Sequence, residues 1–196
     1  MSSVKLSTVL SARSYALDLT EGQPQGHAAR SCLLGMRIAA QLQLSAGERS
    51  DLFYALLMKD AGCSSNAARV SQLFGGDDQA AKRGLWDRDW RKWREKILAR
   101  VPVFSEFAYD ASCHHERIDG KGYHRGVPGD GLSMAARIMA AADIFDALSA
   151  ARPYRGALPL DQVMKIIQEG RGTQLCPATV DALLVVTSRS TQISPA

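Results

Sequence analysis

The chain has little of what marks secreted or membrane-embedded proteins. Its four cysteines are far apart and form no CxxC pair, so neither a disulfide framework nor a paired-cysteine zinc site is expected. The first twenty residues hold no long apolar run, which argues against a signal peptide. The most apolar segment, 134–151, carries Arg137, Asp143 and Asp146, and charges at that depth are costly in lipid. We therefore expect a cytoplasmic protein with no membrane partner.

Neither positive nor negative charge is in large excess. Lys and Arg number 24 and Asp and Glu number 20, which leaves a net charge of +4. This excess suits an anionic ligand, but it is too small to indicate direct nucleic-acid binding without a clustered basic patch. The 196 residues, of which 46% are hydrophobic, are enough for one soluble domain with a buried core.

The alternation of apolar and polar residues that is typical of strands is missing, and helical periodicity runs throughout. We expect an all-α fold, a bundle of about seven to nine helices. The expected helices lie near residues 4–19, 27–42, 45–60, 82–96, 104–113 and 133–150, and two more begin near Pro159 and Pro177. Ser45 and Glu48 form a capping box at the start of the third. The expected organisation is an N-terminal helix over 1–20 and a single domain over 21–196.

Trp86, Trp90 and Trp93 are spaced so that they share one face of the expected helix over 82–96. We interpret them as a stripe that faces the core. A base-stacking or membrane-surface role for the interleaved arginines is the alternative, and no other part of the sequence favours it.

His114 and His115 are adjacent and are followed by the carboxylate of Glu116. Neutral imidazoles bind borderline divalent ions, and adjacent helical residues point about 100° apart, so one ring can face a metal while the other reaches a second metal or a phosphate. A structural alternative stays open, because two histidines can also cap the C-terminal end of a helix. A zinc-protease HExxH site is not expected, since Asp119 stands where the second histidine is needed.

The segment 114–124 reads HHERIDGKGYH, and AR-I, ADIFDAL and RPYR follow it in order up to residue 155. This series resembles the HD-GYP family of metal-dependent phosphohydrolases, which open cyclic di-GMP. Upstream, Gly26-His27 is similar to the first histidine of that family, and LLMKDAG at 56–62 is similar to the segment that bears its His-Asp doublet. The resemblance covers most of residues 27–187 and implies an HD-domain fold.

The resemblance also implies a site in which two divalent ions, of iron, manganese or zinc, activate water and neutralise a phosphodiester. The implied metal ligands are His27, Asp60, His114, His115 and Asp143, and Asp60, His114 and His115 are the implied catalytic residues. The implied contacts to the nucleotide are Gly122, Tyr123, Arg152 and Arg155. The structural alternatives are that the two arginines pair with nearby aspartates and that the tyrosine packs against the core.

The sequence departs from the family pattern at several of these positions. Lys59 replaces the histidine of the doublet, Cys63 replaces a lysine, and the region of Trp90 lacks a mid-chain histidine. The proline of GYP is His124. A protonated ammonium cannot ligate a cation and repels one, so we expect Lys59 to pair with Asp60 or Asp143 and to replace the charge of a metal.

Three hypotheses follow for the function. The first is a degenerate HD-GYP domain that binds cyclic di-GMP, a related dinucleotide or a partner protein with weak or lost hydrolysis and a weak or vacant metal site. The second is an active metal-dependent phosphodiesterase with a reduced site. The third is a purely structural module that docks a partner protein through the Trp-bearing helix and its basic face.

Overall fold

The computed structural model describes Ala16, Asp18 and residues 25–59, 105–122, 125–151 and 156–191. Within these ranges the chain forms six α-helices and one short 3-10 helix, and no strand is present. The all-α prediction is therefore confirmed, with slightly fewer helices than expected. The predicted helix over 82–96 with its three tryptophans, and most of the one over 4–19, lie outside the described residues.

Two helices follow each other near the start of the described chain. Helix α2 covers His27–Gln41 and begins after Gly26, whose φ of 82° lies in the left-handed region that suits glycine. Helix α3 covers Ala46–Met58. The capping box is confirmed: Ser45 Oγ accepts from Glu48 N, and the Ser45 N–H donates to the Glu48 carboxylate at 2.8 Å.

The remaining α-helices also begin close to where the sequence predicted, and the short 3-10 helix η2 was not predicted. They are α7 at Ser105–Ser112, η2 at Gly129–Gly131, α8 at Met134–Ser149, α9 at Leu160–Glu169 and α10 at Pro177–Thr191. Ser133 caps α8 by accepting from Ala136 N at 3.0 Å. Pro159 precedes α9 and Pro177 opens α10, positions that have no need of a backbone N–H.

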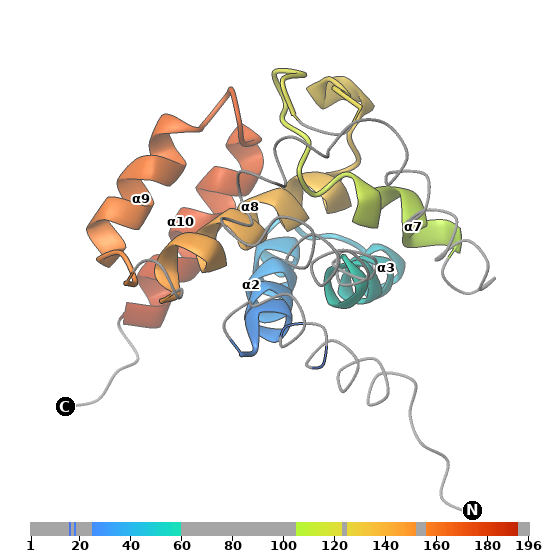
Figure 1. Ribbon diagram of the computed structural model, residues 1–196. Helices are drawn as coiled ribbons and strands as arrows, with labels where there is room; N and C mark the ends of the chain where they lie inside the picture. Colours follow the sequence, from blue (N-terminus) through green and yellow to red (C-terminus); the bar gives the residue numbers. More distant parts are fainter. Residues whose placement is uncertain are drawn as a thin grey trace, which may run out of the picture.

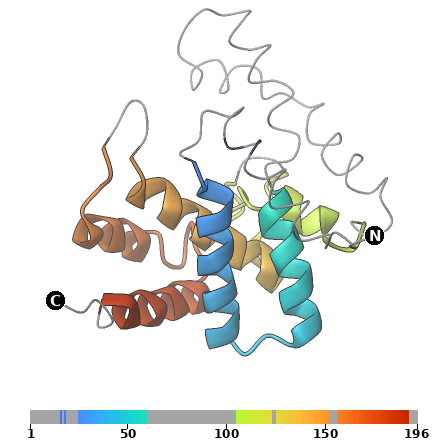
Figure 2. The ribbon, with the colours of Figure 1, turned by 90° about the horizontal axis from the view of Figure 1, so that it is seen from below.

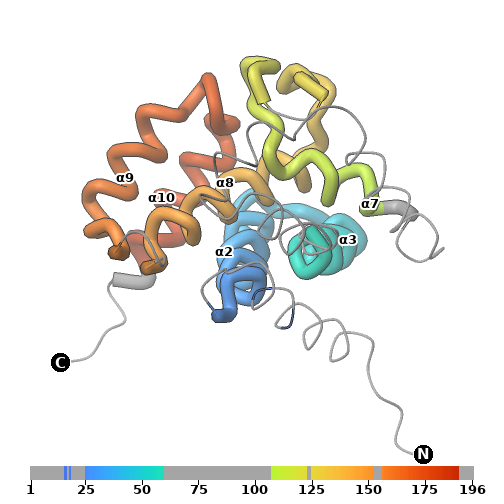
Figure 3. The backbone as a smooth tube through the Cα atoms, viewed as in Figure 1, coloured from blue at the N-terminus to red at the C-terminus, as the bar shows by residue number. Residues whose placement is uncertain are grey.

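Helix α8 runs through the middle of the molecule and packs against α2, α3, α7, α9 and α10 (Figure 1). Helices α2 and α3 lie side by side as an antiparallel pair (Figure 2). The tube in Figure 3 shows α7 near α3 at one end, while α9 and α10 form the other flank. The core at these junctions is aliphatic, and its fully buried members include Ile38, Leu52, Leu56, Ile138, Met139 and Leu183.

The cysteines inside the described ranges, Cys32, Cys113 and Cys176, are buried free thiols. Cys63 lies outside these ranges. None of the described helices has the length and apolar character needed to cross a bilayer.

Candidate functional site

Three charged or ionisable side chains from three helices meet at one buried point. His27 is the first residue of α2, Lys59 follows the last residue of α3, and Asp143 lies in the middle of α8. The Lys59 ammonium is 2.6 Å from Asp143 Oδ1 and 3.0 Å from His27 Nε2. His27 Nε2 and Asp143 Oδ1 are themselves 3.1 Å apart. The Lys59 side chain is 1% exposed, so the amine points into the protein and not to solvent.

This geometry bears out one of the two pairings that the sequence indicated for Lys59, the one with Asp143. The other candidate partner, Asp60, lies outside the described residues. The structure also brings His27 and Asp143, both implied ligands, into direct contact.

Asp146 and Arg30 hold the His27 ring in place through its other nitrogen, Nδ1. The His27 Nδ1–H donates to Asp146 Oδ2 at 2.7 Å, and Asp146 lies one helical turn after Asp143 on the same face of α8. Arg30 donates from Nε and Nη2 to the two carboxylate oxygens of Asp146, at 2.6 and 3.1 Å. Its Nη1 donates to the carbonyl oxygen of Gln25. The imidazole is thus fixed at both ring nitrogens by carboxylates of a single helix.

The pKa values follow from this charge arrangement. Burial and the nearby ammonium lower the pKa of His27, but the hydrogen bonds to Asp143 and Asp146 outweigh them and raise it to about 8. Burial alone would raise the pKa of Asp143, yet the charge of Lys59 and the hydrogen bond from His27 hold it well below its ordinary value. Burial acts likewise on Asp146, and the hydrogen bonds from His27 and Arg30 lower its pKa. Both carboxylates are therefore ionised at neutral pH.

His114 and His115 lie in the turn that follows α7, not within the helix. Because of this turn their rings lie close together, with centroids 4.0 Å apart and ring planes tilted by 44°, instead of diverging as they would on a helix. His114 Nδ1 donates to the Ala111 carbonyl in the last turn of α7, so the capping role that the sequence left open is present for this residue. The charges of both imidazoles also contribute to lowering the pKa of Asp143.

Glu116 has a role that sequence reasoning missed. Its side chain is buried, and its two carboxylate oxygens accept the backbone N–H groups of Arg125, at 2.7 Å, and Val127, at 3.1 Å. A Cβ on Gly122 would meet Glu116 Cα at 2.5 Å. Only glycine therefore fits at position 122, where the loop passes close to Glu116. Glu116 therefore anchors the glycine-rich loop through both of its carboxylate oxygens.

Other implied site residues cannot be placed in this geometry. Asp60, Tyr123, Arg152 and Arg155 lie outside the described residues, as do three of the departures from the family pattern, Cys63, Trp90 and His124.

The described side chains do not fit a metal centre. Within the described ranges, no three His, Cys, Asp or Glu side chains converge as ligands of one ion. The point where His27 Nε2 and Asp143 Oδ1 converge is taken by the Lys59 ammonium, whose positive charge repels a cation. The two implied ligands His27 and Asp143 are thus engaged with the ammonium of Lys59.

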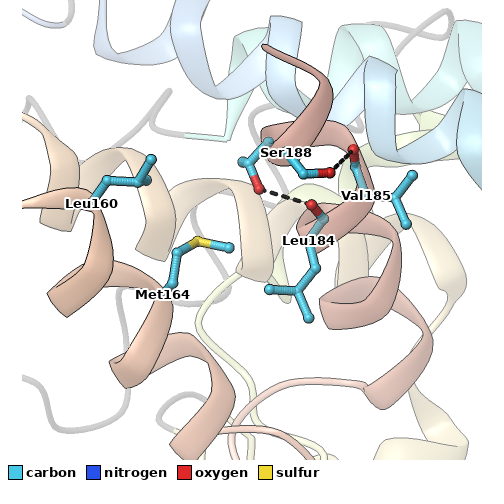
Figure 4. A pocket seen from close by; sticks show the side chains of 6 residues that line it. Leu160, Met164, Leu184, Val185 and Ser188 are labelled. Atoms are coloured by element: carbon cyan, nitrogen blue, oxygen red, sulfur yellow. Dashed lines mark hydrogen bonds between the residues drawn. The ribbon is translucent and has the colours of Figure 1, made fainter. Parts of the chain in front are cut away.

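A separate groove of about 470 Å³ lies between α9 and α10 (Figure 4). Its lining is mostly apolar and consists of Leu160, Met164, Leu184, Val185, Thr187 and Ser188. The hydroxyl groups of Thr187 and Ser188 donate to carbonyls of their own helix. Because none of its lining residues is titratable, the groove has no side chain suited to general acid–base chemistry.

Comparison with known proteins gave consistent matches. A family model described as HD domain matches residues 13–178. The chain is 36% identical over 178 residues to 3'3'-cGAMP-specific phosphodiesterase 3 of Vibrio cholerae serotype O1. This match covers 91% of this chain and 38% of that protein. It is 48% identical over 71 residues to the cyclic di-GMP phosphodiesterase response regulator RpfG of Xanthomonas campestris pv. campestris, over 36% of this chain and 19% of that protein.

The fold has a match among solved structures as well. The crystal structure of a cyclic GMP-AMP specific phosphodiesterase of Vibrio cholerae superposes with a TM-score of 0.72 at 25% sequence identity. The match covers 95% of this chain and 49% of that one. The chain thus spans less than half the length of these similar proteins.

Proposed function

Because the chain belongs to the HD domain family of phosphohydrolases, in its HD-GYP type, we propose that it binds a cyclic dinucleotide and hydrolyses it weakly or not at all. Phosphodiesterases of this family are generally metal-dependent. The similar proteins are named for 3'3'-cGAMP and for cyclic di-GMP, so the proposed ligand is a cyclic dinucleotide that contains guanine.

The observation that carries the loss of hydrolysis is the position of the Lys59 ammonium, 2.6 Å from Asp143 and buried. In a two-metal mechanism the cations generate hydroxide and stabilise the leaving oxygen. An amine fixed at the ligand atoms supplies one positive charge but cannot lower the pKa of a bound water as a divalent ion does. The site therefore lacks an efficient source of the nucleophile.

The binding half of the proposal depends on residues of the glycine-rich loop and the RPYR segment. The proposed contacts are Gly122, Tyr123, Arg152 and Arg155. Arginine donates in pairs to phosphate oxygens and to guanine edges, and tyrosine stacks on a base. The anchoring of the loop by Glu116 supports this assignment, since it keeps Gly122 close to a residue that follows the histidine pair directly in the chain.

The test is calorimetric titration of the purified chain with cyclic di-GMP and with 3'3'-cGAMP, together with chromatography for linear products in the presence of Mn²⁺ or Fe²⁺. We expect binding of at least one dinucleotide and no steady product formation. Stoichiometric metal with sustained turnover would instead establish the active phosphodiesterase, whose product formation should then disappear in His114→Ala. Absence of affinity for both dinucleotides would favour the protein-docking module.

A pair of arginine variants makes the binding test specific. Arg155→Ala should weaken dinucleotide affinity at least tenfold, because a charge-assisted pair is lost. Arg189→Ala removes an exposed arginine of α10, which contacts Gln41 at 3.4 Å, and should leave the affinity unchanged. Equal effects of the two substitutions would show that the attraction is only a general one for positive charge.

A further inference from the structure

An imidazole nitrogen of His27 and a carboxylate oxygen of Asp143, both atom types that bind divalent metals, lie close together. His27 Nε2 and Asp143 Oδ1 are 3.1 Å apart, and the Lys59 ammonium lies 3.0 and 2.6 Å from them. If each atom bound a common ion at about 2.1 Å, a separation of 3.1 Å would give an angle of roughly 95°, between the octahedral and the tetrahedral angle. The two atoms therefore have acceptable ligand geometry for one divalent ion, and the ammonium nitrogen contacts both of them at hydrogen-bond distance.

The surroundings that orient a metal-bound histidine are also present. His27 Nδ1 donates to Asp146, and Asp146 is held by Arg30 through two hydrogen bonds. A carboxylate behind the imidazole fixes which ring nitrogen carries the hydrogen and directs the other nitrogen toward the ion. Here the nitrogen that is so directed faces Lys59 and Asp143.

Lys59 is held at this point by its place in the fold. It directly follows α3, and its side chain is 1% exposed. A buried ammonium that left its carboxylate would lose the charge that compensates it, so the amine stays with Asp143. A divalent cation and the ammonium cannot share the position, since like charges so close repel strongly.

We propose that Lys59 Nζ is a tethered cation in a surviving metal position, so that exchanging this one amine for an imidazole restores binding of a borderline divalent ion such as Mn²⁺ or Zn²⁺. The inference concerns the same site as the proposed function but does not require that a dinucleotide binds. Under this proposal, the side chain at position 59 decides whether the junction of α2, α3 and α8 binds a metal ion. An imidazole at position 59 supplies a third ligand at the point where His27 and Asp143 converge.

The experiment compares the wild-type chain with Lys59→His, Lys59→Gln and Lys165→His. Lys59→Gln removes the charge without adding a good metal ligand, and Lys165→His places the same new side chain on the exposed face of α9, where the lysine is 77% exposed. Each protein is incubated with Mn²⁺ or Zn²⁺, freed of excess ion by gel filtration and analysed for metal per chain by mass spectrometry. Thermal midpoints are measured with metal and with EDTA.

The wild type, Lys59→Gln and Lys165→His should retain little metal, and their midpoints should not respond to metal or EDTA. Lys59→His should retain about one ion per chain and show a midpoint that rises with metal and falls with EDTA, because an ion that binds only the folded state stabilises it. A Lys59→His protein that folds only when metal is added supports the proposal equally.

Stoichiometric metal in the wild type overturns the inference, and that measurement needs no variant. It is overturned as well if Lys59→Gln folds while Lys59→His retains no metal, whether or not the latter folds. Failure of the wild type to bind a dinucleotide would instead overturn the proposed function alone, since no nucleotide enters the metal measurements.

Discussion

The Nδ1 atom of His27 and the Oδ2 atom of Asp146 are 2.7 Å apart, although 119 positions separate the two residues in the chain. This hydrogen bond joins the first turn of α2 to the last turn of α8. It also completes a chain of charges that runs from the partly exposed Arg30 to the buried Lys59.

Asp146→Ala should therefore be strongly destabilising. The substitution leaves His27 buried without its carboxylate and frees the guanidinium of Arg30, and breaking a buried charge pair typically costs about 3–5 kcal/mol. Chemical denaturation measures the free energy of unfolding. The control is Asp181→Ala, which breaks an exposed pair with Arg171 and should change that free energy little. Similar losses for both variants would contradict a central role for Asp146.

The contact between α2 and α3 predicts opposite effects at two helical glycines. A Cβ on Gly35 would meet Leu56 Cδ1 at 2.6 Å, so Gly35→Ala should lower the free energy of unfolding by about 1–3 kcal/mol through overpacking. A Cβ on Gly47 in α3 meets nothing within 4 Å, so Gly47→Ala should raise it by about 0.5–1 kcal/mol. Thermal or urea unfolding distinguishes the two. Stabilisation by both alanines would mean that the helices are less tightly packed here.

The anchoring of the glycine-rich loop predicts a large effect for a small change at Glu116. In Glu116→Gln an amide N–H faces one of the backbone donors, either that of Arg125 or that of Val127, so a buried hydrogen bond is lost. The expected loss of stability is about 1–3 kcal/mol. Hydrogen exchange at those two backbone amides should become faster.

The matched control for this change is Glu169→Gln on α9, where the glutamate side chain is 65% exposed. It should leave both stability and loop exchange unchanged. If the two amides exchange at the same rate in Glu116→Gln as in the wild type, the loop is held by other contacts.

The pair formed by Arg117 and Asp119 gives a prediction for pH. The hydrogen bonds from the Arg117 guanidinium lower the pKa of Asp119 from 3.8 to about 2. Because the folded-state pKa is depressed, the stabilisation from this pair is complete above the unfolded value near 3.8 and is lost as the pH falls through about 2. Arg117→Gln should return the Asp119 titration, followed by carboxyl-carbon NMR, toward about 3.9. Arg171→Gln, the control, should leave it unmoved.

Much of the fold could be predicted because its signals are local. The Ser45–Glu48 capping box and the prolines before α9 and α10 act within one turn of chain, and each element begins where these residues place it. The family resemblance rested on motifs of the same kind, contiguous runs such as the one that begins at His114.

The charged cluster could be predicted only in part. Sequence reasoning offered Asp60 and Asp143 as partners of Lys59 from the chemistry of an ammonium, and the contact with Asp143 is present. It gave Asp146 no contact with His27 and gave Glu116 no loop-anchoring role. Residue spacing cannot show which side chains meet across three helices or across a loop.

The sequence by itself determined the helices, their starting points and the identity of the charges, since these depend on propensity, capping and residue type within a few positions. Only the tertiary structure decided that the amine of Lys59 lies between His27 and Asp143, with Asp146 and Arg30 behind the imidazole. The physical reason is that burial removes the screening of water, so the partner that each charge meets in the packed core decides what the site can bind.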